Sequence, residues 1–214
     1  MSNISSCLRK TVIISLKAFG TLVSILAVIF LIDMYFIALS NSTRSGPLRI
    51  DNGSPVLVSA HELLSQTPVL RQMSDDSLRF AAMPSFGRRW FAVALSSDGK
   101  NVRGWVVILD RETGTKSKKK FSMEQSAYAR MMIKFDDQAD GYWGEARGWT
   151  DGTSLAFERN RGGRIVSGVG NSPCHYAVIT NVMARGLSRH LPSIAELIEP
   201  EAESYSQSEH CDAF

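Results

Sequence analysis

The sequence predicts an α+β protein: one N-terminal transmembrane helix followed by an antiparallel sheet of five or six strands, with two longer helices packed on one face. Three observations predict this class. A long apolar segment lies near the N-terminus, a hairpin pattern spans residues 89–110, and two later segments carry apolar residues at helical spacing. The order strand, strand, strand, helix occurs twice, as expected for helices gathered on an antiparallel sheet.

The apolar N-terminal segment is long enough to cross a membrane. As a helix, residues 12–32 would cover about 30 Å, which matches the hydrocarbon core of a bilayer, and Asp33 follows at the boundary. Because Arg9 and Lys10 precede this span, we expect residues 1–11 to be cytoplasmic. The chain after the span would then lie outside the cell membrane, in a periplasmic or extracellular position.

A cleaved signal peptide is the alternative interpretation of this segment. Ala38, Leu39 and Ser40 form a small-x-small pattern that is typical of a cleavage site, so the signal would end at residue 40. Residues 34–39 are more apolar than is usual before such a site, which favours an uncleaved signal anchor. Both interpretations export the rest of the chain, so we expect no nucleic-acid partner.

Composition divides the exported part into three regions. Residues 41–58 begin with many Ser, Asn, Gly and Pro residues and are expected to form a linker, and residues 59–190 are expected to form one α+β domain. Residues 191–214 carry six acidic residues and no Lys or Arg, although the whole chain has a net charge of +3, so the domain itself is basic. A basic domain can meet anionic lipid or cell-envelope polymers, or its charge can serve solubility alone.

The first part of the domain shows helical signals. Residues 59–62 have the spacing of a capping box before an apolar pattern, which predicts a short helix that Pro68 limits. A second short helical segment is predicted to begin near Ser74.

A β-hairpin follows at residues 89–110. We expect Asp98 and Gly99 to form a two-residue loop, which would pair Leu95 with Val102. One face of this hairpin is apolar, and the other mixes tryptophan, alanine, valine and arginine. A third strand is expected at residues 118–122, where a run of lysines is typical of a solvated loop or an edge strand.

The second half repeats this order. A helix is predicted from Ser122, with an apolar stripe at Ala127, Tyr128, Met131, Met132 and Phe135. Three short strands are predicted at residues 142–149, 154–160 and 164–170. Ser172 and Pro173 then predict the start of a last helix.

Catalytic motifs are scarce. His175 is the best catalytic candidate, because it is expected in the first turn of the last helix beside Cys174, with Asp151 or Glu158 as an acid or base partner. This is the basis of the alternative function, a small exported hydrolase or transferase. We expect no metal and no cofactor, since neither metal-ligand spacing nor a nucleotide-binding motif is present.

The aromatic residues favour a binding function instead. Trp105, Tyr142, Trp143 and Trp149 lie on or beside predicted strands among small and charged residues, where they can form a binding surface or pack under other elements. Cys174 and Cys211 share the exported side and can form a disulfide. The leading expectation is therefore a single-pass membrane-anchored protein whose exported domain binds a protein partner or an envelope polymer.

Overall fold

The computed structural model describes residues 20–32, 44–48, 55–139, 152–171 and 175–198. The chain divides into two compact units, residues 1–39 and residues 40–214, which are described separately. In the first unit, residues 20–32 are helical. Within the described ranges, no helix combines the length and the apolar character needed to cross a membrane. Residues 12–19 of the expected span lie outside these ranges.

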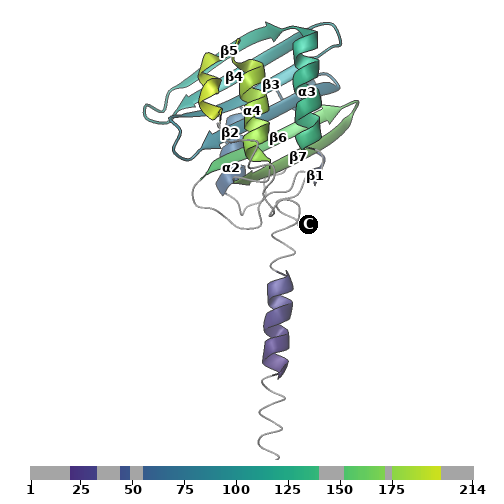
Figure 1. The fold of residues 1–214 in the computed structure, drawn as a ribbon, viewed down its shortest axis with the longest axis vertical. Helices are drawn as coiled ribbons and strands as arrows, with labels where there is room; N and C mark the ends of the chain where they lie inside the picture. The colour runs from purple at the N-terminus through teal and green to yellow at the C-terminus, as the bar shows by residue number, and fades with distance from the viewer. Residues whose placement is uncertain (1–19, 33–43, 49–54, 140–151, 172–174, 199–214) are drawn as a thin grey trace, which may run out of the picture. The chain divides into compact units, whose positions relative to one another are not determined.

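The second unit is built on one antiparallel sheet (Figure 1). Its strand order is β1-β7-β6-β2-β3-β4-β5, so β2 is central and β5 is an edge strand. The strands are β1 Arg44–Ser45, β2 Asp76–Pro84, β3 Arg89–Ser97, β4 Val102–Asp110, β5 Lys116–Met123, β6 Thr153–Arg161 and β7 Arg164–Asn171. This confirms the α+β class and the antiparallel sheet. The strand expected at residues 142–149 lies outside the described residues.

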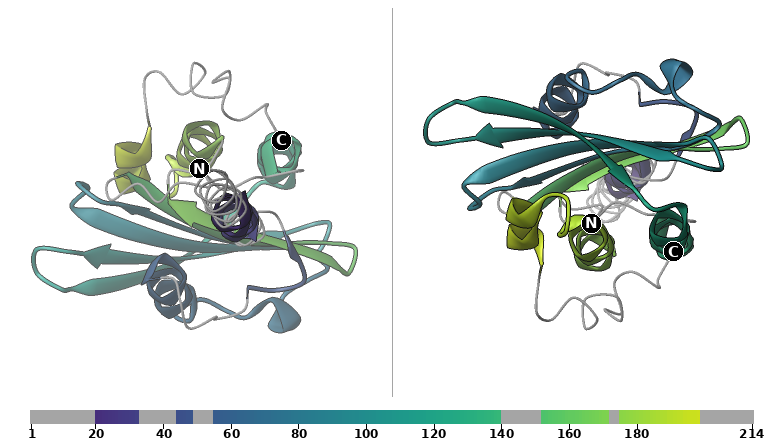
Figure 2. Two further views of the ribbon diagram at one scale, coloured as in Figure 1. Left: turned by 90° about the horizontal axis from the view of Figure 1, so that it is seen from below. Right: turned by 90° about the horizontal axis from the view of Figure 1, so that it is seen from above.

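Helices cover both faces of this sheet (Figure 2). Helices α3 (Gln125–Ala139) and α4 (Tyr176–Leu187) lie on one face with the 3-10 helix η2 (Pro192–Leu197), and α2 (Pro55–Leu64) lies on the other. A second 3-10 helix, η1 (Leu70–Gln72), precedes β2.

Two helix starts differ from the prediction. Helix α2 begins at Pro55, so the expected capping box at residues 59–62 lies inside the helix. Helix α4 begins at Tyr176, and His175 precedes it as the N-cap residue. In both cases the local signal is correct in kind but misplaced by a few residues, because packing against the sheet determines how far a helix extends.

The prediction of a helix near Ser74 was wrong, since β2 runs from Asp76 to Pro84 at the centre of the sheet. Leu78 and Phe80 face α3 and α4, while Ala81 and Met83 pack under α2. A strand that is covered on both faces has no regular alternation of apolar and polar residues. This strand therefore lacks the period-2 signal that identifies a half-exposed strand.

The larger core lies between the sheet and helices α3 and α4. Tyr128, Met131, Met132 and Phe135 of α3 are all buried in it. Phe135 makes edge-to-face contacts with Phe80 of β2 and with Phe157 of β6, with ring centroids 6.4 and 5.4 Å apart.

This core continues past residue 190. Ile194 and Leu197 of η2 are buried in it. The packed part of the domain therefore extends through η2, beyond the end that composition suggested.

The hairpin formed by β3 and β4 has a longer turn than expected. Its register pairs Leu95 with Gly104 and Ser97 with Val102, which leaves a four-residue loop at residues 98–101. The Asp98 carboxylate accepts hydrogen bonds from the backbone N–H groups of Lys100 and Asn101, at 3.0 and 2.7 Å, and these bonds hold the pKa of Asp98 below its ordinary value. The shift is two residues, so each side chain keeps its expected face.

Gly104 lets an aromatic side chain lie flat on the sheet. It pairs across strands with Phe121, and a Cβ atom added at Gly104 would lie only 2.2 Å from the Phe121 ring. The same ring stacks on His190, with centroids 5.0 Å apart and planes at 16°. Gly104 therefore leaves space for the Phe121 ring, which in turn contacts His190 just after the end of α4.

We predict that Gly104→Ala destabilises the domain by about 1–3 kcal/mol, because the added methyl group must displace the Phe121 ring. Urea denaturation of the purified chain, followed by tryptophan fluorescence, measures this loss. In a Phe121→Ala background the same change at Gly104 should cost much less, since the ring is absent. An equal cost in both backgrounds would contradict the proposed contact.

Candidate functional site

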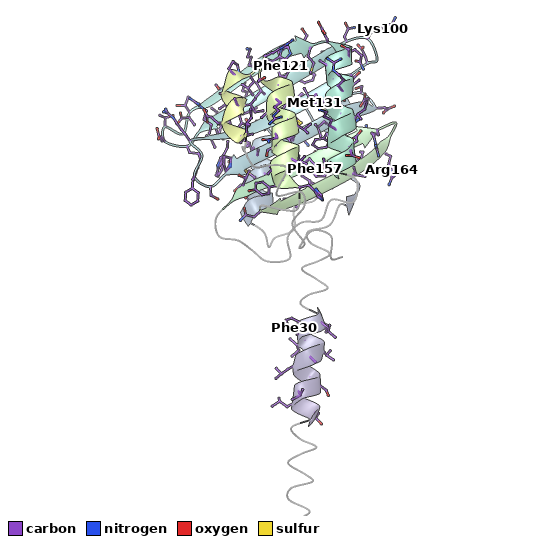
Figure 3. All side chains as sticks on the ribbon, in the orientation of Figure 1. Phe30, Lys100, Phe121, Met131, Phe157 and Arg164 are labelled. Carbon is purple, nitrogen blue, oxygen red and sulfur yellow. The ribbon has the colours of Figure 1, made fainter. Side chains whose placement is uncertain are left out.

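A large groove lies along the outer surface of α3 and α4. Its volume is about 1190 Å³, and it is lined by both helices, the loop at residues 98–101, the start of the α3 segment and the residues that follow α4. Figure 3 labels Lys100 beside the N-terminal end of α3 and Met131 between the two helices. The groove therefore lies on the helical layer, away from α2.

Close helix packing forms the floor of the groove. A Cβ atom added at Gly186 of α4 would lie 2.2 Å from the sulfur of Met131 on α3, so the glycine permits the close approach of the two helices. Val182 is half-buried beside it, and Ile133 on the α3 side is 71% exposed. The floor is apolar and its walls are open to solvent.

The walls of the groove are basic. Five cationic side chains from three segments line it, all of them exposed: Lys100, Arg130, Lys134, Arg185 and Arg189. Two carboxylates, Glu124 and Asp137, also line it. In the part of the chain that the structure describes, none of the five cations has an ion-pair partner or a side-chain hydrogen bond.

Local structure explains how these cations converge. Arg130 and Lys134 are four residues apart on α3, and Arg185 and Arg189 have the same spacing from the last turn of α4 onward. Residues at this spacing lie on one face of a helix. Because α3 and α4 pack side by side on the sheet (Figure 1), the two basic pairs lie on the two sides of one groove.

A buried arginine fixes α3, and with it one wall of the groove. Arg159 of β6 donates two hydrogen bonds to the Asp136 carboxylate of α3, at 2.8 and 3.1 Å, and a third to Asp76 of β2, at 2.7 Å. Tyr128 also donates to Asp76, at 2.9 Å, and burial raises the pKa of Tyr128 above its ordinary value of 10.0. The paired carboxylates raise the pKa of the Arg159 guanidinium against the opposing effect of burial.

The other wall is tied to the edge of the sheet. The Lys119 ammonium of β5 donates a hydrogen bond to the backbone carbonyl of His190, at 3.0 Å, beside the stack of His190 on Phe121. These contacts hold the residues after α4, including Arg189, close to β5. Both walls therefore rest on defined contacts with the sheet.

The structure places Glu158, one of the catalytic candidates, in a buried ion pair. Its carboxylate pairs with Arg79 and also accepts a hydrogen bond from the backbone N–H of Leu48, at 3.0 Å. Arg79 donates to the carbonyl of Leu64 at the end of α2, at 2.6 Å, and to the Thr67 hydroxyl, at 3.3 Å. Glu158 is thus occupied in joining α2 to the sheet.

His175 lies on the other side of the sheet from Glu158. It precedes α4, which packs in the core opposite α2, and its backbone is left-handed with a φ of 62°. Its side chain makes no cap hydrogen bond, and its buried Nδ1 has no hydrogen-bond partner among the described residues. The structure does not bring His175 and Glu158 together. Asp151 lies outside the described residues, so its pairing with His175 stays a prediction.

The predicted binding aromatics are only partly described. Trp105 is half-buried on β4, beside Lys120 of β5, on the side of the sheet that α2 partly covers. It is therefore not part of the groove. Tyr142, Trp143 and Trp149 lie outside the described residues, as do Cys174 and Cys211, so the aromatic surface and the disulfide stay predictions.

The sequence carries a weak signal for the groove cations. Two basic pairs at a spacing of four residues lie beside the apolar stripes of the two longest helices. Each pair alone is typical of a solvated helix face. Only the packing of α3 beside α4 combines them into one site.

No protein-family model, curated protein or solved structure matches this chain. Within the described residues, no group of three or more His, Cys, Asp and Glu side chains could hold a metal ion. The basis for a function is therefore the groove itself, with its apolar floor and its five Lys and Arg side chains.

We predict that Glu158→Gln destabilises the protein by about 3–5 kcal/mol, because it leaves the Arg79 guanidinium buried without a counter-charge. Arg79 is 8% exposed and Glu158 is 4% exposed. The matched control is Glu196→Gln, which breaks the partly exposed pair with Arg89 and should cost about 1 kcal/mol or less. Urea denaturation of both variants checks this, and equal costs would show that the buried pair has no special role.

Proposed function

We propose that this chain is a single-pass membrane-anchored protein whose exported α+β domain binds a negatively charged protein partner or envelope polymer in the groove between α3 and α4. The observation that carries the proposal is the convergence of five Lys and Arg side chains, against two carboxylates, on one groove, with no ion-pair partner for any of the five among the described residues. Surface cations that serve only solubility are usually spread over a surface with charges of both signs.

The chemistry of the groove suits a flexible polyanion. Arg130, Arg185 and Arg189 can each bind a carboxylate or phosphate through two parallel hydrogen bonds, whereas Lys100 and Lys134 act as point charges. The apolar floor between the helices can accept methylene groups or small side chains of the same ligand. An acidic polypeptide or a phosphate-bearing polymer of the cell envelope has both features.

The N-terminal helix supports the anchor in this proposal. Within residues 20–32, apolar side chains are exposed on all sides of the helix; Phe30 and Leu31, for example, are 64% and 66% exposed. A helix that is apolar all round is stable only when other apolar material surrounds it. A bilayer supplies such an environment, and residues 12–32 together have the length of a span.

We predict that the double variant Arg130→Gln/Arg185→Gln binds acidic polymers about tenfold more weakly than the native chain, because one charge is lost from each wall. Fluorescence anisotropy with labelled poly-L-glutamate and, separately, with labelled polyphosphate measures the affinity of the detergent-solubilised chain. Binding of the native chain should weaken as salt is added, since salt screens exposed charges beyond about 10 Å at 0.1 M.

The matched control is Lys116→Gln/Lys120→Gln, which removes two cations from the opposite side of the sheet. It changes the net charge equally and should leave the affinity close to native. An equal loss in both double variants would mean that net charge, and not the groove, attracts the polymer. Absence of binding to either polymer at low salt, both by the native chain and by a variant with Glu199, Glu201 and Glu203 changed to Gln, would overturn the proposal.

A separate prediction concerns the anchor. The native protein should remain in the membrane fraction after alkaline carbonate extraction, and its intact mass should be that of the uncleaved chain, because residues 12–32 would hold it in the bilayer. A soluble protein whose mass begins at Asn41 would contradict the anchor and support the cleaved signal peptide. Export of the domain would still stand in that case.

A further inference from the structure

We propose that the acidic C-terminal segment, residues 199–214, docks in the basic groove of its own domain and competes there with the anionic partner. This inference rests on the proposed function, because it uses the same groove. Nothing beyond the chain itself is needed for the interaction. The consequence is a binding site that its own tail partly blocks.

The first argument is complementary charge. Residues 199–214 contain no Lys or Arg, and they contain five acidic residues: Glu199, Glu201, Glu203, Glu209 and Asp212. The groove presents five cations, none of which has an ion-pair partner among the described residues. A segment with this composition matches the ligand chemistry of the groove.

The second argument is reach. The last described element, η2, ends at Leu197 and packs against α4, which forms one wall of the groove. Sixteen residues follow from residue 199 and can extend over about 50 Å. Crossing α4 takes about 10–12 Å, and the 15 residues of α3 are about 22 Å long. The segment is therefore long enough to cross α4 and to follow the whole groove.

The third argument is effective concentration. A segment joined to its binding site by a short flexible connection is present there at a concentration on the order of millimolar. Even weak contacts between exposed charges then occupy the groove for much of the time. An outside polyanion must displace the tail, so its apparent affinity is lower than the groove alone would give.

The test compares two variants of the full chain with equal changes in net charge. In the tail variant, Glu199, Glu201 and Glu203 are changed to Gln. In the control, three exposed carboxylates outside the groove are neutralised by Glu62→Gln, Asp75→Asn and Glu112→Gln. We expect the tail variant to bind labelled poly-L-glutamate about tenfold more tightly than the native chain at low salt, and the control to bind as the native chain does.

Carbodiimide cross-linking of the native chain provides a readout that needs no outside ligand. The reagent joins an amine to a carboxylate in contact with it, so tail glutamates should be linked to Lys100 or Lys134 within one molecule, as peptide mass spectrometry detects. Links to Lys116 or Lys120 in place of these would place the tail elsewhere and overturn the proposal.

The outcomes separate this inference from the proposed function. Equal binding of poly-L-glutamate by the native chain and the tail variant would overturn the tail proposal and leave the groove function standing. If neither chain binds poly-L-glutamate or polyphosphate, the groove function fails, and cross-links to Lys100 or Lys134 would then still support the docked tail. Absence of both binding and cross-links would overturn both.

Discussion

The domain depends on two neighbouring residues of one strand that hold its two helical layers. Glu158 and Arg159 are adjacent in β6, so their side chains point to opposite faces of the sheet. Glu158 pairs with Arg79, which bonds to the end of α2, and Arg159 pairs with Asp136 of α3 and with Asp76. Arg79 and Asp76 both belong to the central strand β2, which pairs with β6. Each of these contacts therefore involves a residue of β2 or of β6. The groove lies on the layer that Arg159 holds.

Buried charges at this place constrain the fold more than they stabilise it. Moving charged groups out of water costs several kcal/mol each, and pairing recovers that cost only with good geometry. A slip of β6 by one residue would move Glu158 to the face of α3 and Arg159 to the face of α2, with both left unpaired. The register of the two central strands is therefore linked to the placement of α2 and α3. Glu158 is held in its buried ion pair with Arg79, and His175 lies on the other side of the sheet. Glu158 therefore does not form a catalytic pair with His175.

Four arginines of the domain illustrate two different roles. Arg79 and Arg159 are buried and use their guanidinium groups on backbone carbonyls and carboxylates inside the protein. Arg130 and Arg185 are exposed on the groove and have no ion-pair partner within the described residues. Like charges that face one groove repel each other and oppose folding slightly. Cations held together in this way contribute nothing to the core, and in our proposal an anionic partner or the acidic tail supplies their counter-charge.

The sequence alone determined the class of the fold and most of its elements, because half-covered strands and helices leave a periodic signal. The β3–β4 hairpin has strong strand residues, and the stripe of α3 from Tyr128 to Phe135 packs as its spacing indicates. The tertiary structure alone decided the role of β2, since a strand buried on both faces has no alternation and its partners lie in β3 and β6. It also decided the site: Arg130 and Arg185 are 55 positions apart in the sequence, and only the packing of α3 against α4 places them on one groove. Local patterns report which face of an element is buried, whereas a binding site depends on which elements become neighbours.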